Sequence, residues 1–193
     1  MIKPIIYIDT VIARDWTHNR DNYSRELLTE IKNKKLKCLI SVFGLMELAD
    51  IEQEGLFLNK KAFVEREDLD IIFSKRKRRD LNNQDLEKSS KYLEDFIEHY
   101  KNIIKIVDLN QDGWSLALNL GAESNLNATD VIHLATAWQN RCNLIITRDE
   151  FFIKEAEKIL KNEKIWKSFK ILNPKKALSF LRKIQTNQRW RST

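Results

Sequence analysis

The stretch IIYIDT, residues 5–10, joins a short apolar run directly to a carboxylate. The run is rich in β-branched residues and has no alternating polar positions, which is typical of a strand buried on both faces of a sheet. Ligands of open α/β sheets bind beyond the carboxyl ends of the strands. The stretch therefore predicts a parallel sheet with Asp9 at its functional edge.

The rest of the chain repeats this pattern of short apolar runs separated by helical periodicity. The other runs are KCLIS (37–41), IIKIV (103–107), NLIIT (143–147) and SFKIL (168–172). Helical patterns cover about 11–32, 42–58, 84–101, 111–121, 128–140, 150–162 and 175–184, and residues 59–83 are the least predictable. This alternation predicts a three-layer α/β/α fold with a central parallel sheet of about five strands.

Composition narrows the class of protein. The 193 residues are 42% hydrophobic and include four Gly and two Pro, so we expect one domain over 1–193, with a basic tail from about 185. Cys38 and Cys142 each open an apolar run and are expected to be buried thiols. No apolar run reaches the ~18 residues of a membrane span, and the opening residues lack the features of a signal peptide. We therefore expect a cytoplasmic protein without a membrane partner, and its net charge of +6 is compatible with a polyanionic one.

Three further acids join Asp9 as candidate site residues. Asp149 follows NLIIT after one residue, and Asp130 lies near the start of the helical stretch NATDVIHLATAWQ (127–139). Glu47 belongs to SVFGLMELAD (41–50), a helix that is apolar nearly all round, so it is expected to be a partly buried acid. Gly44, one turn earlier, leaves room for a group to approach Glu47.

Each acid also has a purely structural interpretation. Asp9 and Asp149 fit as N-caps of the helices that follow them, and Asp130 fits the first turn of a helix capped by Asn127. Glu47 fits as a member of a buried ion pair. Four bare carboxylates that converge at one edge, however, repel one another unless a cation neutralises them. Oxygen ligands without His or Cys favour Mg²⁺ or Mn²⁺ over zinc.

The segments that carry these acids resemble the four signature segments of the PIN domain family. They are IIYIDT, SVFGLMELA, NATDVIHLATA and LIITRDEFF, in that order, and the resemblance spans roughly residues 4–173. It implies a metal-dependent endoribonuclease, in which Asp9, Glu47, Asp130 and Asp149 are the catalytic and metal-binding residues around Mg²⁺ or Mn²⁺. Many bacterial members are toxins of toxin–antitoxin pairs. This chain is longer than the compact toxins, through a helical insertion at about 52–100 and the tail, which bears on the toxin role more than on the chemistry.

Residues beside the acids are candidates for supporting roles. Thr10, Ser41 and Thr147 are placed to orient carboxylates or substrate. His133 lies one turn from Asp130, where it either touches the substrate or is a packed, acid-bonded histidine. His18 and His99 are expected on surface helices.

Basic residues offer a weaker RNA-binding prediction. The consecutive residues Lys75, Arg76, Lys77, Arg78 and Arg79 are either a solvated segment or a grip on backbone phosphates. Trp190, between Arg189 and Arg191, either stacks on a base or belongs to a disordered terminus.

Three functions remain open on the sequence. The first is the metal-dependent ribonuclease, with RNA as its partner and with an antitoxin protein or a second copy of the chain as further partners. The second is a non-catalytic PIN-like module that binds RNA or a protein. The third, a phosphoryl-transfer switch or phosphatase, is disfavoured because Asp9 is followed by Thr10, Val11 and Ile12 rather than by a second acid.

Overall fold

The computed structural model of the chain describes residues 3–162 and 169–189. Its centre is one parallel sheet with the strand order β3-β2-β1-β4-β5. The strands are β1 (Ile6–Ile8), β2 (Cys38–Ser41), β3 (Ile104–Val107), β4 (Leu144–Ile146) and β5 (Lys170–Leu172). This confirms the predicted parallel sheet of five strands in a three-layer α/β/α arrangement, with each strand inside the run that predicted it.

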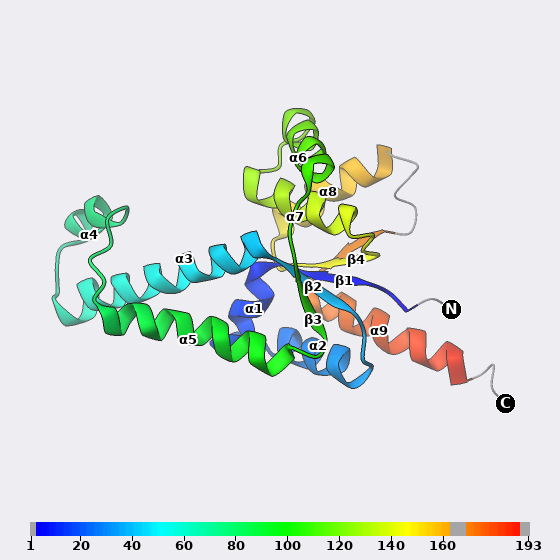
Figure 1. Cartoon of the computed structure of the whole chain (residues 1–193), viewed down its shortest axis with the longest axis horizontal. Coiled ribbons are helices and arrows are strands. Elements are labelled where there is room, and N and C mark those ends of the chain that lie inside the picture. The colour runs from blue at the N-terminus through cyan, green and yellow to red at the C-terminus, as the bar shows by residue number, and fades with distance from the viewer. Residues whose placement is uncertain (1–2, 163–168, 190–193) are drawn as a thin grey trace.

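Helices cover both faces of the sheet (Figure 1). They are α1 (Thr10–Thr17), α2 (Asn22–Asn33), α3 (Val42–Asn59), α4 (Leu69–Lys75), α5 (Asn83–Tyr100), α6 (Gln111–Glu123), α7 (Ala128–Gln139), α8 (Glu150–Asn162) and α9 (Pro174–Arg189), with a π-helical turn η1 (Lys60–Val64) after α3. None of the helices in the described ranges has the length and apolar content needed to cross a membrane.

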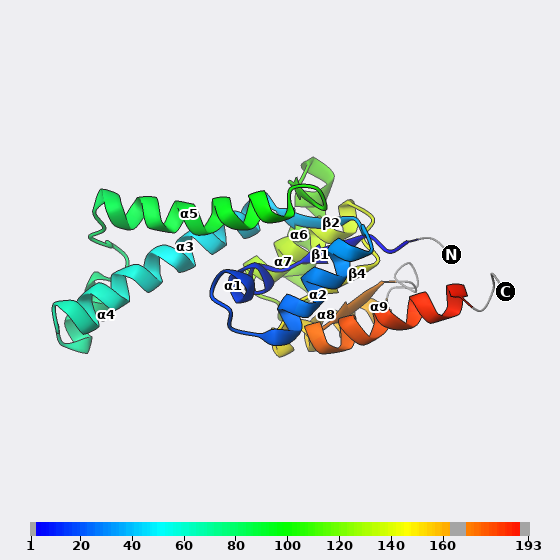
Figure 2. The same cartoon turned by 90° about the horizontal axis from the view of Figure 1, so that it is seen from below.

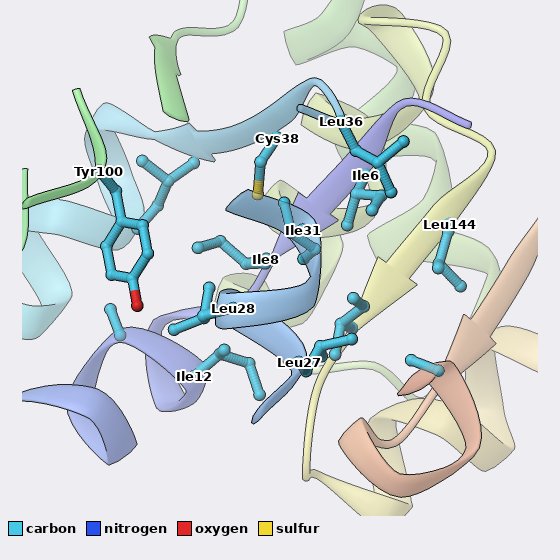
Figure 3. Close-up of a cluster of buried hydrophobic side chains, with 14 of the residues drawn as sticks. Ile6, Ile8, Ile12, Leu27, Leu28, Ile31, Leu36, Cys38, Tyr100 and Leu144 are labelled. Carbon is cyan, nitrogen blue, oxygen red and sulfur yellow. The ribbon is translucent and has the colours of Figure 1, made fainter. Parts of the chain in front are cut away.

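Strand alternation divides the core into two clusters. Ile6 and Ile8 of β1 point to one face, where they pack with α2 residues such as Leu28 and Ile31 (Figure 3). Tyr7, between them, points to the other face and packs with α7 and α8. All three β1 side chains are fully buried, and full burial of one large aliphatic side chain stabilises the fold by about 1.5–3 kcal/mol. The central strand therefore anchors both layers and fixes the position of the residue that follows it.

The predicted helix over 11–32 is wrong, because this segment forms two helices. His18 ends α1, and Asn19 adopts the left-handed conformation with φ 53°. Asp21 then caps α2 by accepting a hydrogen bond from the Ser24 amide. Asn tolerates positive φ and Asp is a preferred N-cap, so the sequence THNRD holds a break that apolar periodicity alone does not show.

The segment expected as an insertion, about 52–100, projects away from the sheet. The second half of α3 and the first half of α5 lie side by side and carry η1 and α4 at their far end (Figures 1 and 2). The least predictable stretch, 59–83, therefore contains short helices. At the other end of the chain, the helix expected near 175–184 continues to Arg189, so the predicted tail from about 185 begins as helix; Trp190 and Arg191 lie outside the described residues.

The two cysteines are buried and free, as predicted. Cys38 begins β2 and Cys142 lies two residues before β4. They belong to different core clusters, on opposite faces of the sheet.

Candidate acidic site

Asp9 is held at the carboxyl end of the central strand by hydrogen bonds from its neighbours. It is the N-cap of α1, and its Oδ1 accepts a hydrogen bond of 2.6 Å from the Thr10 amide. Because Ile8 pairs with Ile146 across the sheet, Thr147 follows alongside, and its hydroxyl donates to Asp9 Oδ2 at 2.6 Å. Burial raises the pKa of the Asp9 carboxyl, although the charge of His133 and the Thr147 hydroxyl oppose the shift.

Glu47 lies beside Asp9 but comes from α3, the helix that follows the neighbouring strand β2. Ser41 ends β2 and caps α3 by accepting a hydrogen bond of 2.8 Å from the Gly44 amide, which directs Glu47 toward Thr10. The Thr10 hydroxyl donates to Glu47 Oε2 at 2.5 Å. The side chain is 28% exposed, so the prediction of a partly buried acid is confirmed. Burial alone would raise the pKa of Glu47, but hydrogen bonds from His133 and Thr10 outweigh it and lower that pKa.

Asp130 lies in the first turn of α7, as its structural interpretation requires. Asn127 is the N-cap and accepts a hydrogen bond of 2.8 Å from the Asp130 amide. The Asp130 carboxylate does something else: its Oδ2 is buried and has no hydrogen-bond partner among the described residues. Burial, followed by the charges of Asp149 and Asp9, raises the pKa of Asp130 to about 7. The cap therefore explains the backbone of Asp130 but leaves its carboxylate without a structural role.

Asp149 caps a helix and also lies in the same pocket as the other acids. Its Oδ1 accepts a hydrogen bond of 2.8 Å from the Phe152 amide and so caps α8. Its own amide donates to the Thr147 hydroxyl at 3.0 Å. The same residue lines one pocket with the three other acids. Capping and convergence are thus compatible, and the two interpretations of Asp9 and Asp149 do not exclude one another.

His133 is a buried member of the acid cluster. Its Nε2 lies 3.2 Å from Glu47 Oε2 and 3.3 Å from Asp9 Oδ1, so the three residues together offer ligand atoms close enough to hold one metal ion. Burial alone would lower the pKa of His133, but the hydrogen bond to Glu47 and the charge of Asp9 raise it above its usual value. The interpretation of His133 as a packed, acid-bonded histidine is therefore confirmed, although the donor set expected from the sequence contained no histidine.

Tyr7 supports His133 from the opposite side of the ring. The Tyr7 hydroxyl lies 2.7 Å from His133 Nδ1 and donates to Ser41 Oγ at 2.8 Å. Burial raises the pKa of Tyr7, so the hydroxyl keeps its proton. A protonated His133 can then donate from Nδ1 to the Tyr7 oxygen and from Nε2 to Glu47. Ser41 and Thr10, predicted as supporting groups, lie in the same hydrogen-bond network.

Gly44 does not leave the open space that the sequence suggested. A Cβ at this position would lie 3.1 Å from Ser41 Oγ, 3.2 Å from Thr10 Oγ1 and 3.3 Å from His133 Cε1. The prediction that Gly44 makes room for an approaching group therefore holds only for groups of the protein itself. The glycine lets α3 pack closely against the network that positions Glu47.

The four acids line a pocket of about 430 Å³ with basic residues on its wall. We call it the acid pocket; its remaining lining residues are Thr10, Val11, Arg14, Arg20, Ile51, Asn127, Thr129, His133 and Arg148. Arg148 is fixed by an ion pair of 2.7 Å to the buried Asp15, whose other oxygen accepts from Ser24. Negative charge lies at the centre of the pocket and positive charge beside it.

The consecutive basic residues begin at the last residue of α4 and run into the loop that precedes α5. Three of them pair with acids: Lys75 with Glu67 at 3.0 Å, Arg76 with Glu54, and Arg79 with Asp50 at 2.7 Å. The RNA-binding role of Lys75, Arg76, Lys77, Arg78 and Arg79 stays a prediction, and the pairs give three of the five a structural role as well.

Sequence reasoning missed Tyr7 and the three arginines of the pocket. A signal was present for Arg14, which is one helical turn after Thr10 and so shares its face of α1. Arg148 stands between Thr147 and Asp149, at the same edge of the sheet. The hydroxyl of Tyr7 gave no signal, because a tyrosine in an apolar strand packs as core.

Comparisons with known proteins agree with this geometry. The family model described as PIN domain matches residues 6–159. Among solved structures, 12 chains match. One belongs to the crystal structure of VapBC2 from Rickettsia felis bound to a DNA fragment from their promoter, with 14% identity, 88% of this chain and 98% of that chain covered, and a TM-score of 0.53. Curated protein sequences gave no match. Since the family model covers well over half of the residues, the chain belongs to the PIN domain family.

Proposed function

We propose that this protein is a metal-dependent endoribonuclease that hydrolyses phosphodiester bonds of RNA at the acid pocket. The observation that carries the proposal is the buried Oδ2 of Asp130, which lacks a partner in the described structure and lines a pocket with three other carboxylates. A buried carboxylate without a partner is costly for the fold, and a cation removes this cost.

The donor set fits a hard divalent cation. Asp9, Glu47, Asp130 and Asp149 offer carboxylate oxygens, which Mg²⁺ and Mn²⁺ prefer, and these four would hold the ion. His133 offsets part of the negative charge between Asp9 and Glu47 but leaves Asp130 and Asp149 without such a contact. When bound, the ion would supply positive charge to the scissile phosphate and a water of lowered pKa.

The residues of the chain supply the positioning. Thr10 and Thr147 hold Glu47 and Asp9 in fixed orientations through hydrogen bonds of 2.5 Å and 2.6 Å. Tyr7 fixes the ring of His133, whose charge offsets the repulsion between Glu47 and Asp9. Arg14, Arg20 and Arg148 would contact phosphate oxygens of the RNA backbone, where guanidinium groups bind strongly. No protein nucleophile is needed for this hydrolysis.

Cleavage assays with paired variants test the proposal. The native protein should cleave single-stranded or looped RNA with Mg²⁺ or Mn²⁺ and lose this activity in EDTA. Asp130→Asn and Asp9→Asn should fold and lose activity, because Asn keeps the shape but removes the charge that a hard cation needs. Asp112→Asn is the matched control, since Asp112 is also an acid in the first turn of a helix but is exposed.

Two outcomes would count against a nuclease. If Asp130→Asn cleaves RNA as well as Asp112→Asn, Asp130 serves the fold alone. If the native protein binds RNA but cleaves none with either metal, the chain is the non-catalytic module that remains the alternative.

The likeness to the VapBC2 structure supports an antitoxin as protein partner. We propose that this chain is the toxin-type component of such a pair. Its expression should arrest growth, the arrest should need Asp9, and coexpression of the protein encoded by a small adjacent gene should relieve it. Growth arrest that persists in Asp9→Asn would contradict a toxin that acts by cleavage. Sedimentation of the purified chain would test whether it also forms a homodimer.

A further inference from the structure

A second pocket adjoins the acid pocket and shares part of its wall. It has a volume of about 360 Å³ and lies where α1, α3 and α5 meet. Arg14, Arg20 and Ile51 line both pockets. We call it the flanking pocket, defined by these three residues together with His18, Glu52, Gly55, Leu56, Asn59, Lys88 and Tyr92. Its volume falls within the range of small-molecule sites, about 300–1,000 Å³.

Two polar atoms of this pocket are buried without partners. The Glu52 side chain is 4% exposed, and its Oε2 pairs with His18 Nε2 at 2.6 Å. Its Oε1 has no donor among the described residues, and Arg14 Nε has no acceptor among them either. Buried polar atoms are nearly always hydrogen-bonded, so an unsatisfied acceptor and an unsatisfied donor in a single pocket point to a ligand that carries both complements.

Aromatic rings form another part of the wall. The His18 and Tyr92 rings lie 5.0 Å apart between centroids, at 51° to one another. Lys88, one turn before Tyr92 on α5, is exposed and lines the pocket. Aromatic side chains beside a cation are the usual platform for an unstacked base and its phosphate.

We propose that the flanking pocket binds the nucleotide next to the scissile phosphate of a single-stranded RNA. This rests on the proposed function, because the acid pocket must hold the phosphate to which that nucleotide is joined. Arg14 and Arg20, shared by both pockets, contact the connecting backbone, and the base lies against His18 and Tyr92. A nucleotide supplies the phosphate oxygens that Arg14 Nε lacks and the N–H groups that Glu52 Oε1 lacks.

The free acceptor also defines a base preference. Adenine, cytosine and guanine each carry an exocyclic amino group that can donate to Glu52 Oε1. The only donor on the uracil base, the ring N3–H, lies between two carbonyl oxygens that a carboxylate repels. The pocket therefore favours an amino-bearing base over uracil at this position. Glu52 is a specificity-determining residue in this scheme, and the acid pocket alone reads no base.

Gly55 offers a way to fill the pocket without disturbing the fold. A Cβ at Gly55 would meet no atom within 4 Å, so Gly55→Leu places its side chain in open space of the flanking pocket. Gly121→Leu is the matched control, because Gly121 is also a helical glycine at the surface, and its Cβ would have only an ordinary contact of 4.0 Å to Val131. Equal melting temperatures of the two variants would show that both fold.

The experiment measures binding of fluorescent A10, C10 and U10 RNA in EDTA, and cleavage of a mixed-sequence decamer with Mg²⁺ or Mn²⁺. Native protein should bind A10 and C10 about fivefold tighter than U10, and Glu52→Gln should reduce this preference. Gly55→Leu should weaken binding of all three, and raise KM for the decamer, by about tenfold with little change in kcat. Gly121→Leu should match the native protein.

Each contrary result has a distinct meaning. If Gly55→Leu binds and cleaves like Gly121→Leu, or if Glu52→Gln keeps the native base preference, the flanking pocket is not a base site and water satisfies Glu52 and Arg14. If Gly55→Leu loses binding of a protein partner while RNA binding is unchanged, the occupant is a peptide and this proposal is overturned. If the native protein cleaves no RNA at all, the proposed function fails first.

Discussion

The Tyr7 hydroxyl lies 2.7 Å from Nδ1 of His133, and this contact links the central strand to the acids on the far side of the imidazole ring. Tyr7 belongs to β1, whose next residues lead to Asp9, and His133 Nε2 lies 3.3 Å from Asp9 Oδ1. β1 therefore positions Asp9 directly and, through Tyr7, also positions His133, which lies beside Asp9 as its counter-charge.

Tyr7→Phe should destabilise the protein by about 1–3 kcal/mol, because it leaves buried His133 Nδ1 without its partner. Urea unfolding of the metal-free protein measures this loss. Tyr23→Phe is the control, since Tyr23 is 43% exposed and its hydroxyl is not part of the acid cluster. Equal unfolding free energies for the two variants would show that the contact has no energetic role.

Asp130→Asn should stabilise the metal-free protein at neutral pH. Burial raises the pKa of Asp130 to about 7, so the folded protein keeps a proton that the unfolded chain releases near pH 4. The unfolded state binds fewer protons between these values, and the free energy of unfolding therefore falls as the pH rises from about 4 to about 7. Asn carries no charge, so the variant does not lose stability over this pH range. Each 1 kcal/mol of unfolding free energy that it keeps relative to the native protein raises Tm by about 2–4 °C.

The same Tm measurement gives the metal dependence. Mg²⁺ or Mn²⁺ should raise the Tm of the native protein at pH 7 by mass action, and the rise should be much smaller in Asp130→Asn. Asp112→Asn should behave as the native protein does in both respects. A native Tm that neither metal changes would contradict a metal site in the acid pocket.

Gly44→Ala and Gly55→Ala, both on α3, should change stability in opposite directions. A Cβ at Gly44 would press on Ser41 Oγ at 3.1 Å, Thr10 Oγ1 at 3.2 Å and His133 Cε1 at 3.3 Å. Overpacking of this kind costs about 1–3 kcal/mol, more than the gain of about 1 kcal/mol in helix propensity. At Gly55 nothing lies within 4 Å, so only the gain remains. Calorimetry of both variants measures whether each is stabilised or destabilised. A stabilised Gly44→Ala would show that the neighbouring side chains move aside without loss of stability.

The sheet could be predicted because apolar runs of β-branched residues have few alternative structures. The runs that contain β1 and β4 each lead into an acid, and the parallel order then brings Asp9 and Asp149 to one edge. Apolar periodicity predicted one helix over 11–32, because a single left-handed residue, Asn19, separates two amphipathic helices that have similar periodicity. Local periodicity reports a buried face but not a change in direction of the chain.

The sequence revealed only those site residues whose type is unusual for their surroundings. Carboxylates in apolar surroundings stand out, so Asp9 and Glu47 were found from the sequence. Tyr7 looks like a core residue, and its contact with His133 spans 126 positions of the chain, so it forms only when β1 and α7 pack together. The flanking pocket depends in the same way on α5 packing beside α1 and α3, which no local pattern specifies.

The last prediction separates two roles within the basic residues 75–79. Lys75, Arg76 and Arg79 pair with acids of the projecting segment, whereas the described residues offer no ion pair to Lys77 and Arg78. Replacing all five by Gln should weaken RNA binding across sequences and flatten its dependence on salt. Lys77→Gln with Arg78→Gln should account for most of this change, with a salt slope smaller by about 0.7 for each phosphate that is no longer neutralised.

The triple variant of Lys75, Arg76 and Arg79 should chiefly affect the projecting helices instead. Ion pairs at the protein surface contribute little to stability, so the helices should become only somewhat more open to proteolysis while the salt slope changes little. Lys175→Gln with Lys176→Gln on α9 is the charge-matched control for the double variant, because both lysines are exposed and α9 lies outside the projecting segment (Figure 1). If the double variant and this control give the same salt slope, Lys77 and Arg78 are solvated residues, and phosphate contacts must be sought among the arginines of the acid pocket.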